Sequence, residues 1–393
     1  MKKAVMYGAG NIGRGFIGQV FSLSGYEVAF VDVNMAVIDA LNAEKSYPLR
    51  IVTNEGETNT KVENVYGVNG NDIEAVSKTI AEADIMATAV CVNILKFIAP
   101  VLAQAFTYRW ESGNITTLDV IVCENKIEAN EYLKGLIAEK LDEKGKALLE
   151  EKIGFVEASI GRMVPVMTAE QKAEHPLLVL VEPYCELPVD KSAFKNTIPD
   201  LVNLQPFSPF EFFIKRKLYI HNMGHATSAY LGALKGCSYI YEAMGYDNIK
   251  DCVKAAMLES AAMLSKDYDV PYAELEAFVC DLIERFGNKA LGDTIVRVGG
   301  DPKRKLSDAD RFFGAVKDCV KAGLPFDHII CGIAAAMYFC PETDATAPEI
   351  QAEIAEKGVR SFVLARVAEL DEAQQTKVCD AIVAAYNAIG AAK

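Results

Sequence analysis

Three side chains that could carry proton and hydride chemistry stand close together near the middle of the chain. Lys217, Asn222 and His225 follow the pattern K-x4-N-x2-H. On a helix, at roughly 100° per residue, they would project within an arc of about 140°. Removing a hydride from a carbinol carbon requires a base for the hydroxyl proton and donors for the reacting oxygen. A lysine whose pKa is lowered by burial or by a cationic neighbour can be the base, and an asparagine amide can be a donor.

The same stretch allows two other interpretations. His221 and His225 are four residues apart and could hold a metal, but a zincin motif needs Glu where Asn222 stands, so we expect no metal site. A polar helix face in solvent would produce the same spacing, and spacing alone does not separate it from a catalytic face. The two remaining histidines, His175 and His328, are expected to be surface or structural residues.

A further candidate, Asn125, follows the buried strand that we expect at Leu118–Val122. In an open parallel sheet, ligands bind outside the carboxyl ends of the strands. Asn125 is therefore expected on the cofactor side of the sheet, where its amide could donate to a substrate oxygen. A cap for the following helix explains an asparagine at this place equally well.

A glycine-rich loop, G-x-G-x-x-G, begins directly after the first expected strand. In such loops the first glycine permits a tight turn, the second lets the backbone approach a pyrophosphate, and the third lets the helix pack close to the strand. Asp32 ends the next strand about 20 residues on, where a carboxylate would hold the ribose hydroxyls and repel a 2′-phosphate. We therefore expect NAD as the cofactor, although packing glycines without a ligand would give a similar loop. The residues expected to bind it are Gly8, Ala9, Gly10, Asn11, Ile12, Gly13, Arg14 and Asp32.

A cluster of positive charges interrupts an otherwise acidic chain near residue 300. The cluster comprises Arg297, Lys303, Arg304, Lys305 and Arg311. Arginine suits bidentate contact with phosphate, so Arg297, Arg304 and Lys305 are candidates to bind a phosphorylated substrate. A solvated charged loop is the alternative.

The overall charge restricts the partners. Of 393 residues, 40 are Lys or Arg and 54 are Asp or Glu, so the net charge is −14. Such a surface repels phosphate backbones and anionic lipid, so we expect no nucleic-acid or membrane partner. The sequence shows no run of 18 apolar residues and no signal segment, and its ten cysteines lack C-x-x-C or zinc spacing. We expect a cytoplasmic protein, a monomer or a small homo-oligomer.

Strand-like and helix-like segments alternate in the first half, which indicates a parallel sheet with helices on both faces. Seven of the 14 prolines lie between residues 165 and 209, and after Phe210 the pattern is almost wholly helical, with one expected helix at Ala229–Met244. The predicted fold is therefore α/β, a Rossmann-like doubly wound parallel sheet followed by a mainly α-helical domain. We place an NAD-binding domain at residues 1–195 and a helical substrate or catalytic domain at residues 196–393.

These segments together resemble the polyol-specific long-chain dehydrogenases. The resemblance is carried by the string from Gly8 to Gly18, by Asp32-Val-Asn34, by Cys123-Glu124-Asn125 and by the K-x4-N-x2-H pattern. It extends in order to about residue 340. Within that family the match is closest to members that act on hexitol 1-phosphates, so the resemblance implies an NAD-linked interconversion of mannitol 1-phosphate and fructose 6-phosphate. The implied partner is thus a small sugar phosphate or hexitol phosphate.

The resemblance also implies roles for single residues. Lys217 would be the general base, Asn125 and Asn222 would polarise the reacting oxygen, and His225 would orient the substrate, with no metal. Many relatives carry Asp in a V-D-R-I-x-P segment where this chain has Gly161, so any role of that Asp cannot be transferred. A related hexitol or hexuronate reductase, acting for example on fructuronate or tagaturonate, therefore remains an alternative. A regulator that binds NAD without chemistry is a weaker one.

Overall fold

The chain divides into two units in the computed structural model. The structure describes residues 1–165 and 167–392, and the units are Met1–Glu211 and Phe212–Lys393. The first unit thus extends past the boundary expected at 195/196. The additional residues include strand β11 (Leu204–Phe207), which pairs in parallel with β10 (Leu187–Asp190) and so belongs to the first unit.

A six-stranded parallel sheet forms the centre of the first unit, in the order β5-β2-β1-β6-β7-β8. This is the strand order of a doubly wound dinucleotide-binding sheet, so the expected Rossmann-like architecture is confirmed. Its strands are β1 (Lys2–Tyr7), β2 (Tyr26–Asp32), β5 (Val65–Asn69), β6 (Ile85–Thr88), β7 (Leu118–Val122) and β8 (Ile153–Glu157).

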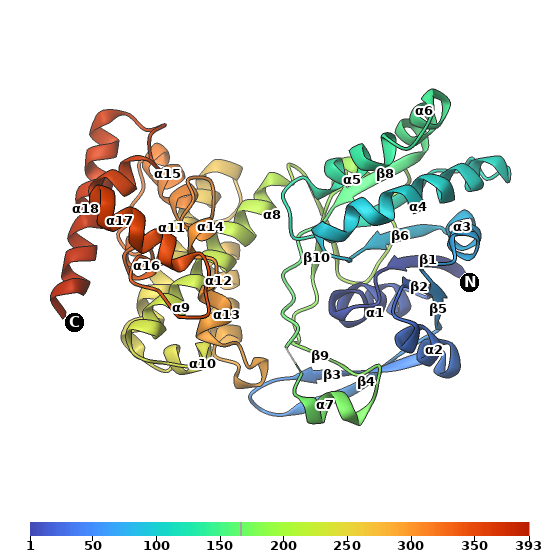
Figure 1. Cartoon of the computed structure of the whole chain (residues 1–393), viewed down its shortest axis with the longest axis horizontal. Helices are drawn as coiled ribbons and strands as arrows, with labels where there is room; N and C mark the ends of the chain where they lie inside the picture. The colour runs from blue at the N-terminus through green and yellow to red at the C-terminus, as the bar shows by residue number, and fades with distance from the viewer. Residues whose placement is uncertain (166, 393) are drawn as a thin grey trace. The chain divides into compact units, whose positions relative to one another are not determined.

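Both faces of the sheet are buried, because successive side chains of a strand point to opposite sides. In β1, Ala4 and Met6 enter one hydrophobic core, whereas Val5 and Tyr7 enter the other. The second core is completed by the helices α3 (Ile73–Ala81), α4 (Val92–Glu111), α5 (Ala129–Ala138) and α6 (Glu143–Lys152) (Figure 1). The first core is completed by η1 (Gly13–Ile17), α1 (Gly18–Leu23), part of α2 (Met35–Glu44) and the small sheet described next.

In this small sheet only the last strand was expected from the sequence, at Leu177–Val181, and the other two were not. The sheet has the order β4-β3-β9 and consists of β3 (Ser46–Val52), β4 (Glu57–Glu63) and β9 (Val179–Val181). The helix α7 (Ala169–Glu174) and the short turn η2 (Lys191–Ala193) complete the first unit. All side chains of β4 except Val62 are exposed, so this edge strand lacks the apolar pattern that predicts a strand.

The second unit is helical throughout, as the sequence predicted (Figure 1). Its elements are α8 (Glu211–Lys215), η3 (Arg216–Asn222), α9 (Met223–Leu234), α10 (Ile240–Ala243), α11 (Asp247–Tyr268), α12 (Tyr272–Phe286), η4 (Lys289–Leu291), α13 (Ile295–Gly299), α14 (Pro302–Lys305), α15 (Phe313–Ala322), α16 (Ile329–Ala336), α17 (Ala347–Leu364) and α18 (Glu372–Ala392). The helix expected at 229–244 ends at Leu234 instead, because Gly236 takes a left-handed conformation with φ +74°. In the described part of the chain, no helix combines the length and the apolar character that a membrane crossing requires.

Candidate active site

A cavity of about 860 Å³ lies at the carboxyl ends of β1 and β6 in the first unit. The strand order reverses between these two strands, so the cavity occupies the position where doubly wound sheets bind ligands. Its volume falls in the range of small-molecule sites. Six residues predicted from the sequence line it: Gly8, Gly10, Asn11, Ile12, Asp32 and Asn125.

The loop glycines differ in what surrounds them. Gly8 has φ +106°, and a Cβ there would overlap the carbonyl oxygen of Ala89. A Cβ on Gly13 would overlap the carbonyl oxygen of Gly8. Gly10 faces open space, with nothing within 4 Å of a Cβ built on it. Gly8 and Gly13 are therefore required by the fold, whereas at Gly10 the missing side chain leaves the backbone accessible from the cavity.

Asp32 is fixed by two backbone donors. Its Oδ2 accepts the N–H of Ala9 at 2.7 Å, and its Oδ1 accepts the N–H of Asn34 at 2.9 Å. An ionised carboxylate has about four acceptor positions, so both oxygens keep capacity for the hydroxyls of a ribose. The loop, the open backbone at Gly10 and this carboxylate fit a dinucleotide.

Arg14 does not line the cavity. It is buried, its Nε donates to the carbonyl of Ala9 at 2.7 Å, and a terminal nitrogen donates to the carbonyl of Leu177 at 2.5 Å. The side chain thus supports the glycine loop from behind rather than facing a ligand. The sequence position of Arg14 beside the glycine loop suggested phosphate binding. Its burial and its two contacts with backbone carbonyls show that it does not face the cavity.

Glu124, which the sequence analysis quoted only as part of a motif, is a buried residue of the cavity wall. Its Oε1 accepts the N–H of Val90 at 2.8 Å, in the loop that follows β6. Burial raises the pKa of Glu124, against the lowering effect of the Val90 and Cys91 amides. Glu124, next to Asn125 in the chain, therefore fixes the loop that follows β6, and this loop packs against Gly8.

Exposed apolar side chains on the cavity wall were missed altogether. Val33 and Phe97 are each 64% exposed, and Ile94 is 41% exposed. A flat apolar group in the cavity could pack against these three side chains. A single exposed apolar residue is common in any protein, so the sequence held no signal that these three share a wall.

In the second unit, the lysine and asparagine lie on a π-helical turn. The π-helix η3 spans Arg216–Asn222, and at its end the N–H of Met223 reaches back five residues to the carbonyl of Leu218. In a π-helix residues five apart stand one turn apart, so Lys217 and Asn222 lie on one face. The sequence predicted one face from α-helical spacing, and the structure reaches it through a rarer turn that is frequent at functional sites.

The surroundings of Lys217 suit a base. The side chain is half-buried. Burial, and then the positive charge of Arg311, lower the pKa of Lys217 to about 8. Arg311 is held nearby through its own contact with the backbone oxygen of Asn222, at 3.4 Å. A substantial fraction of the lysine is therefore neutral near physiological pH.

The two histidines of this segment have different environments. His221 is buried, and its burial, followed by the charge of Arg285, holds its pKa well below the ordinary value. His225 is half-buried, and its Nε2 lies 3.1 Å from Oδ2 of Asp293. Its ring stacks on Phe286, with centroids 4.7 Å apart and planes 8° from parallel. His221 thus belongs to the packing, and His225 has an acidic partner that the sequence did not reveal.

Most of the basic cluster is already paired with acids. Arg297 contacts Asp293. The guanidinium of Arg304 contacts Asp301 at 2.9 Å and Asp310 at 3.2 Å. Lys303 is exposed and pairs with Glu349.

Lys305 is the buried member of this group, with only 5% of its surface exposed. Burial, followed by the charges of Arg311 and Arg304, lowers its pKa to about 8. A solvated charged loop therefore describes Lys303 but not Lys305.

The candidates fall into two groups. Asn125 and the glycine loop share the cavity of the first unit, whereas Lys217, Asn222, His225 and the basic cluster belong to the second. Among the described residues, no group of three His, Cys, Asp or Glu side chains is placed to hold a metal ion.

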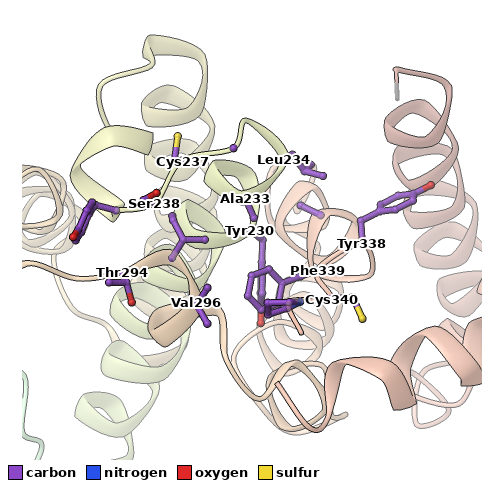
Figure 2. Close-up of a pocket in the computed structure, with 15 residues that line it drawn as sticks. Tyr230, Ala233, Leu234, Cys237, Ser238, Thr294, Val296, Tyr338, Phe339 and Cys340 are labelled. Atoms are coloured by element: carbon purple, nitrogen blue, oxygen red, sulfur yellow. The ribbon is translucent and has the colours of Figure 1, made fainter. Parts of the chain in front are cut away.

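A second cavity, of about 650 Å³, lies inside the second unit. Figure 2 shows Tyr230, Ser238, Thr294 and Phe339 around it. These residues come from α9, from the segment before α10, from the start of α13 and from the segment after α16. None of the predicted site residues lines it.

Two family models together match almost the whole chain. Residues 2–203 match the mannitol dehydrogenase Rossmann domain, and residues 210–390 match the mannitol dehydrogenase C-terminal domain. The chain belongs to the mannitol dehydrogenase family. The resemblance to polyol dehydrogenases is thereby confirmed, and NAD as the cofactor agrees with this family.

Solved structures of similar fold include two polyol dehydrogenases. A D-sorbitol dehydrogenase in substrate-free form is 18% identical, with a TM-score of 0.82, over 99% of this chain and 93% of that one. The mannitol 2-dehydrogenase of Pseudomonas fluorescens, in a ternary complex with NAD and D-mannitol, is 16% identical, with a TM-score of 0.74, over 99% and 92% of the two chains. At these identities the likeness establishes the mannitol dehydrogenase fold, not the substrate.

Proposed function

We propose that this chain is an NAD-dependent mannitol-1-phosphate 5-dehydrogenase, which interconverts D-mannitol 1-phosphate and D-fructose 6-phosphate. The observation that carries the proposal is the state of Lys217. It shares a π-helical face with Asn222, and its pKa is lowered to about 8. A general base works best when its pKa lies near the operating pH. This is the chemistry required to take a proton from a hydroxyl while a hydride leaves the same carbon.

Each protein group has one task in this mechanism, which uses no metal ion. In the oxidative direction the neutral amine of Lys217 accepts the hydroxyl proton, and in the reductive direction its ammonium returns it. The amides of Asn222 and Asn125 donate hydrogen bonds to the reacting oxygen as its charge changes. His225 orients the substrate. NAD, when bound, accepts the hydride.

The phosphate is assigned to Arg297, Arg304 and Lys305. The support is strongest for Lys305, because it is buried and the charges of Arg311 and Arg304 disfavour its protonated form, which a phosphate dianion would favour. Arg297 and Arg304 already contact acids, so a phosphate there would share them with Asp293 and Asp301.

A related enzyme acting on a free hexitol or on a hexuronate, such as fructuronate or tagaturonate, is the second candidate. The acid partners of Arg297 and Arg304 favour it, because they reduce the positive charge available to a phosphate. Gly161 keeps this candidate open, because a role of the Asp expected there cannot be transferred, and a Cβ at this position would come within 3.3 Å of the Tyr184 ring. A non-catalytic NAD-binding regulator is the third candidate, and the tuned Lys217 argues against it.

One substrate panel separates these candidates. NADH oxidation is followed by absorbance with fructose 6-phosphate, fructose, fructuronate and tagaturonate at equal concentrations. We expect the highest kcat/KM with fructose 6-phosphate. A preference for an unphosphorylated substrate would move the assignment to the second candidate, and no NADH oxidation with any of the four substrates would leave only the regulator.

A matched pair of lysine variants tests the phosphate site. Lys305→Ala should raise the KM for fructose 6-phosphate by about tenfold or more, as expected when a charged contact of about 1.5–3 kcal/mol is lost. Lys303→Ala, on the same helix but exposed and paired with Glu349, should leave that KM unchanged. Equal effects of the two variants would contradict the assignment of Lys305.

A further inference from the structure

Asp293 bridges two residues of the candidate site in the second unit. Its Oδ2 lies 3.1 Å from Nε2 of His225, and its Oδ1 contacts the guanidinium of Arg297. The side chains of Asp293 and His225 are only 12% and 16% exposed, so solvent screens their interaction weakly. Arg297 thus places a positive charge beside the second carboxylate oxygen.

The stack on Phe286 fixes the plane of the His225 ring but not which of its edges faces Asp293. The two rings are 4.7 Å apart and nearly parallel. Stacking still allows the ring to turn over by 180° about its Cβ–Cγ bond, which exchanges each nitrogen with a ring carbon and so puts Cε1 in the place of Nε2. The 3.1 Å contact of Nε2 with Oδ2 of Asp293 chooses between these two orientations, because an ionised carboxylate only accepts and so requires an N–H, not a ring C–H, opposite it.

The backbone around Asp293 is fixed on both sides. The carbonyl of Asp293 accepts the N–H of Ile240 at 2.9 Å, and the N–H of Ile295 donates to the carbonyl of Ser238 at 2.9 Å. Figure 2 shows Ser238 and Thr294 on these neighbouring segments, beside the second cavity. A carboxylate on so restrained a backbone can hold a ring in one place.

We propose that Asp293 is a positioning residue that holds the His225 imidazole with its proton on Nε2, so that Nδ1 is the acceptor of the neutral ring. A neutral histidine accepts a hydrogen bond from a substrate hydroxyl through only one of its two nitrogens. With the proton on Nε2, that nitrogen is Nδ1. The proposal rests on the proposed function for its catalytic consequence. The tautomer itself is independent of which substrate the enzyme uses.

The tautomer can be observed directly because the chain has only four histidines. With ¹⁵N-labelled histidine, spectra of the full-length protein at a pH where the rings are neutral separate protonated from unprotonated nitrogens. His225→Gln identifies the signals of His225. We expect a protonated Nε2 and an unprotonated Nδ1 in the wild type, and a change toward the Nδ1–H form in Asp293→Asn, whose amide can donate to Nε2. An Nδ1–H tautomer in the wild type, or identical His225 signals in Asp293→Asn, would overturn the proposal.

Kinetics on the best substrate of the panel provide the second readout. Asp293→Asn should lower kcat/KM about 10- to 100-fold, the effect of losing a hydrogen bond to a charged group, with the dissociation constant of NADH unchanged. The matched control is Glu353→Gln in α17, which likewise removes a carboxylate that contacts two cations, Arg366 and Lys357, and should change neither value. Failure of the wild type to turn over any substrate would refute the proposed function, while the spectra would still decide the tautomer.

Discussion

The reactivity of single residues in this protein follows from burial and from neighbouring charge. Lys217 and Lys305 are both lysines near Arg311, and for both the pKa is lowered to about 8 by burial first and by that arginine second. A positive charge beside an amine disfavours its protonated form. The same chain thus makes one lysine fit for proton transfer and another sensitive to the charge of a bound anion.

Replacing Lys217 tests the base. Lys217→Ala should lower kcat by about 10²–10⁴-fold, the usual contribution of a general base, while NADH binding measured by fluorescence stays unchanged because the cofactor cavity belongs to the first unit. Retention of most turnover would rule out Lys217 as the base. Loss of NADH binding would show instead that the variant perturbs the fold.

The pH dependence tests the neighbouring charge. In the oxidative direction kcat/KM should rise with pH around a midpoint near 8, because the amine of Lys217 must be neutral to accept a proton. Arg311→Gln removes a charge that lowers the pKa, so the midpoint should move to higher pH. Arg360→Gln removes an arginine paired with Asp380 in α17 and α18, and should leave the midpoint in place. An unmoved midpoint in Arg311→Gln would contradict the role of this arginine.

At the scale of elements, short irregular turns place the functional groups. The π-helix η3 brings Lys217 and Asn222 onto one face, and a second π-helix, η1, follows the glycine loop. In η1 the N–H of Gly18 donates to the carbonyl of Gly13, five residues back. Such turns widen a helix locally, so side chains and backbone amides point where an α-helix would not direct them.

The two kinds of loop glycine should respond differently to alanine. Gly10→Ala places its Cβ in open space, so the melting temperature should stay close to that of the wild type while the dissociation constant of NADH rises at least about tenfold. Gly13→Ala overlaps the carbonyl of Gly8, so its melting temperature should fall by several degrees, as for other overpacking substitutions of about 1–3 kcal/mol. Calorimetry and NADH titration of both variants provide the measurement. A Gly10→Ala variant that binds NADH like the wild type would remove this loop from the cofactor site.

For the whole molecule, the division into two units predicts where the cofactor stabilises the protein. The glycine loop, Asp32 and Asn125 share one cavity within the first unit, which has its own two-sided core. Binding to the folded state alone stabilises a protein by about 2.7 kcal/mol at 100 times the dissociation constant.

Hydrogen exchange with and without NADH measures this effect along the chain. We expect the largest gain of protection in the loop after β1, in the loop after β6 and around Asn125. The Gly10→Ala variant at the same NADH concentration is the control and should gain little. Protection confined to the second unit would contradict the assigned cofactor cavity.

Local sequence determined a large part of this protein. The dinucleotide-binding fold could be predicted from spacing alone. Its signals are buried strands, a glycine-rich loop and an acid about 20 residues later, and each is a pattern of residues close together in the chain. The helical second half was also predictable from the sequence. The turn that carries Lys217 and Asn222 is π-helical, whereas the sequence predicted an α-helical face for them. The exposed strand β4 was not readable, because its pairing with β3 replaces the apolar pattern that marks a strand.

Tertiary structure alone decided the electrostatics of the site. Arg14 is directed away from the cavity by its bond to Leu177, 163 residues away, and the cations Arg297 and Arg304 are engaged by acids. The partner of His225, Asp293, lies 68 positions further along the chain, where no spacing rule could connect them. The physical reason is that charge, burial and pKa depend on distance in space, which the fold sets, whereas a motif records only distance along the chain.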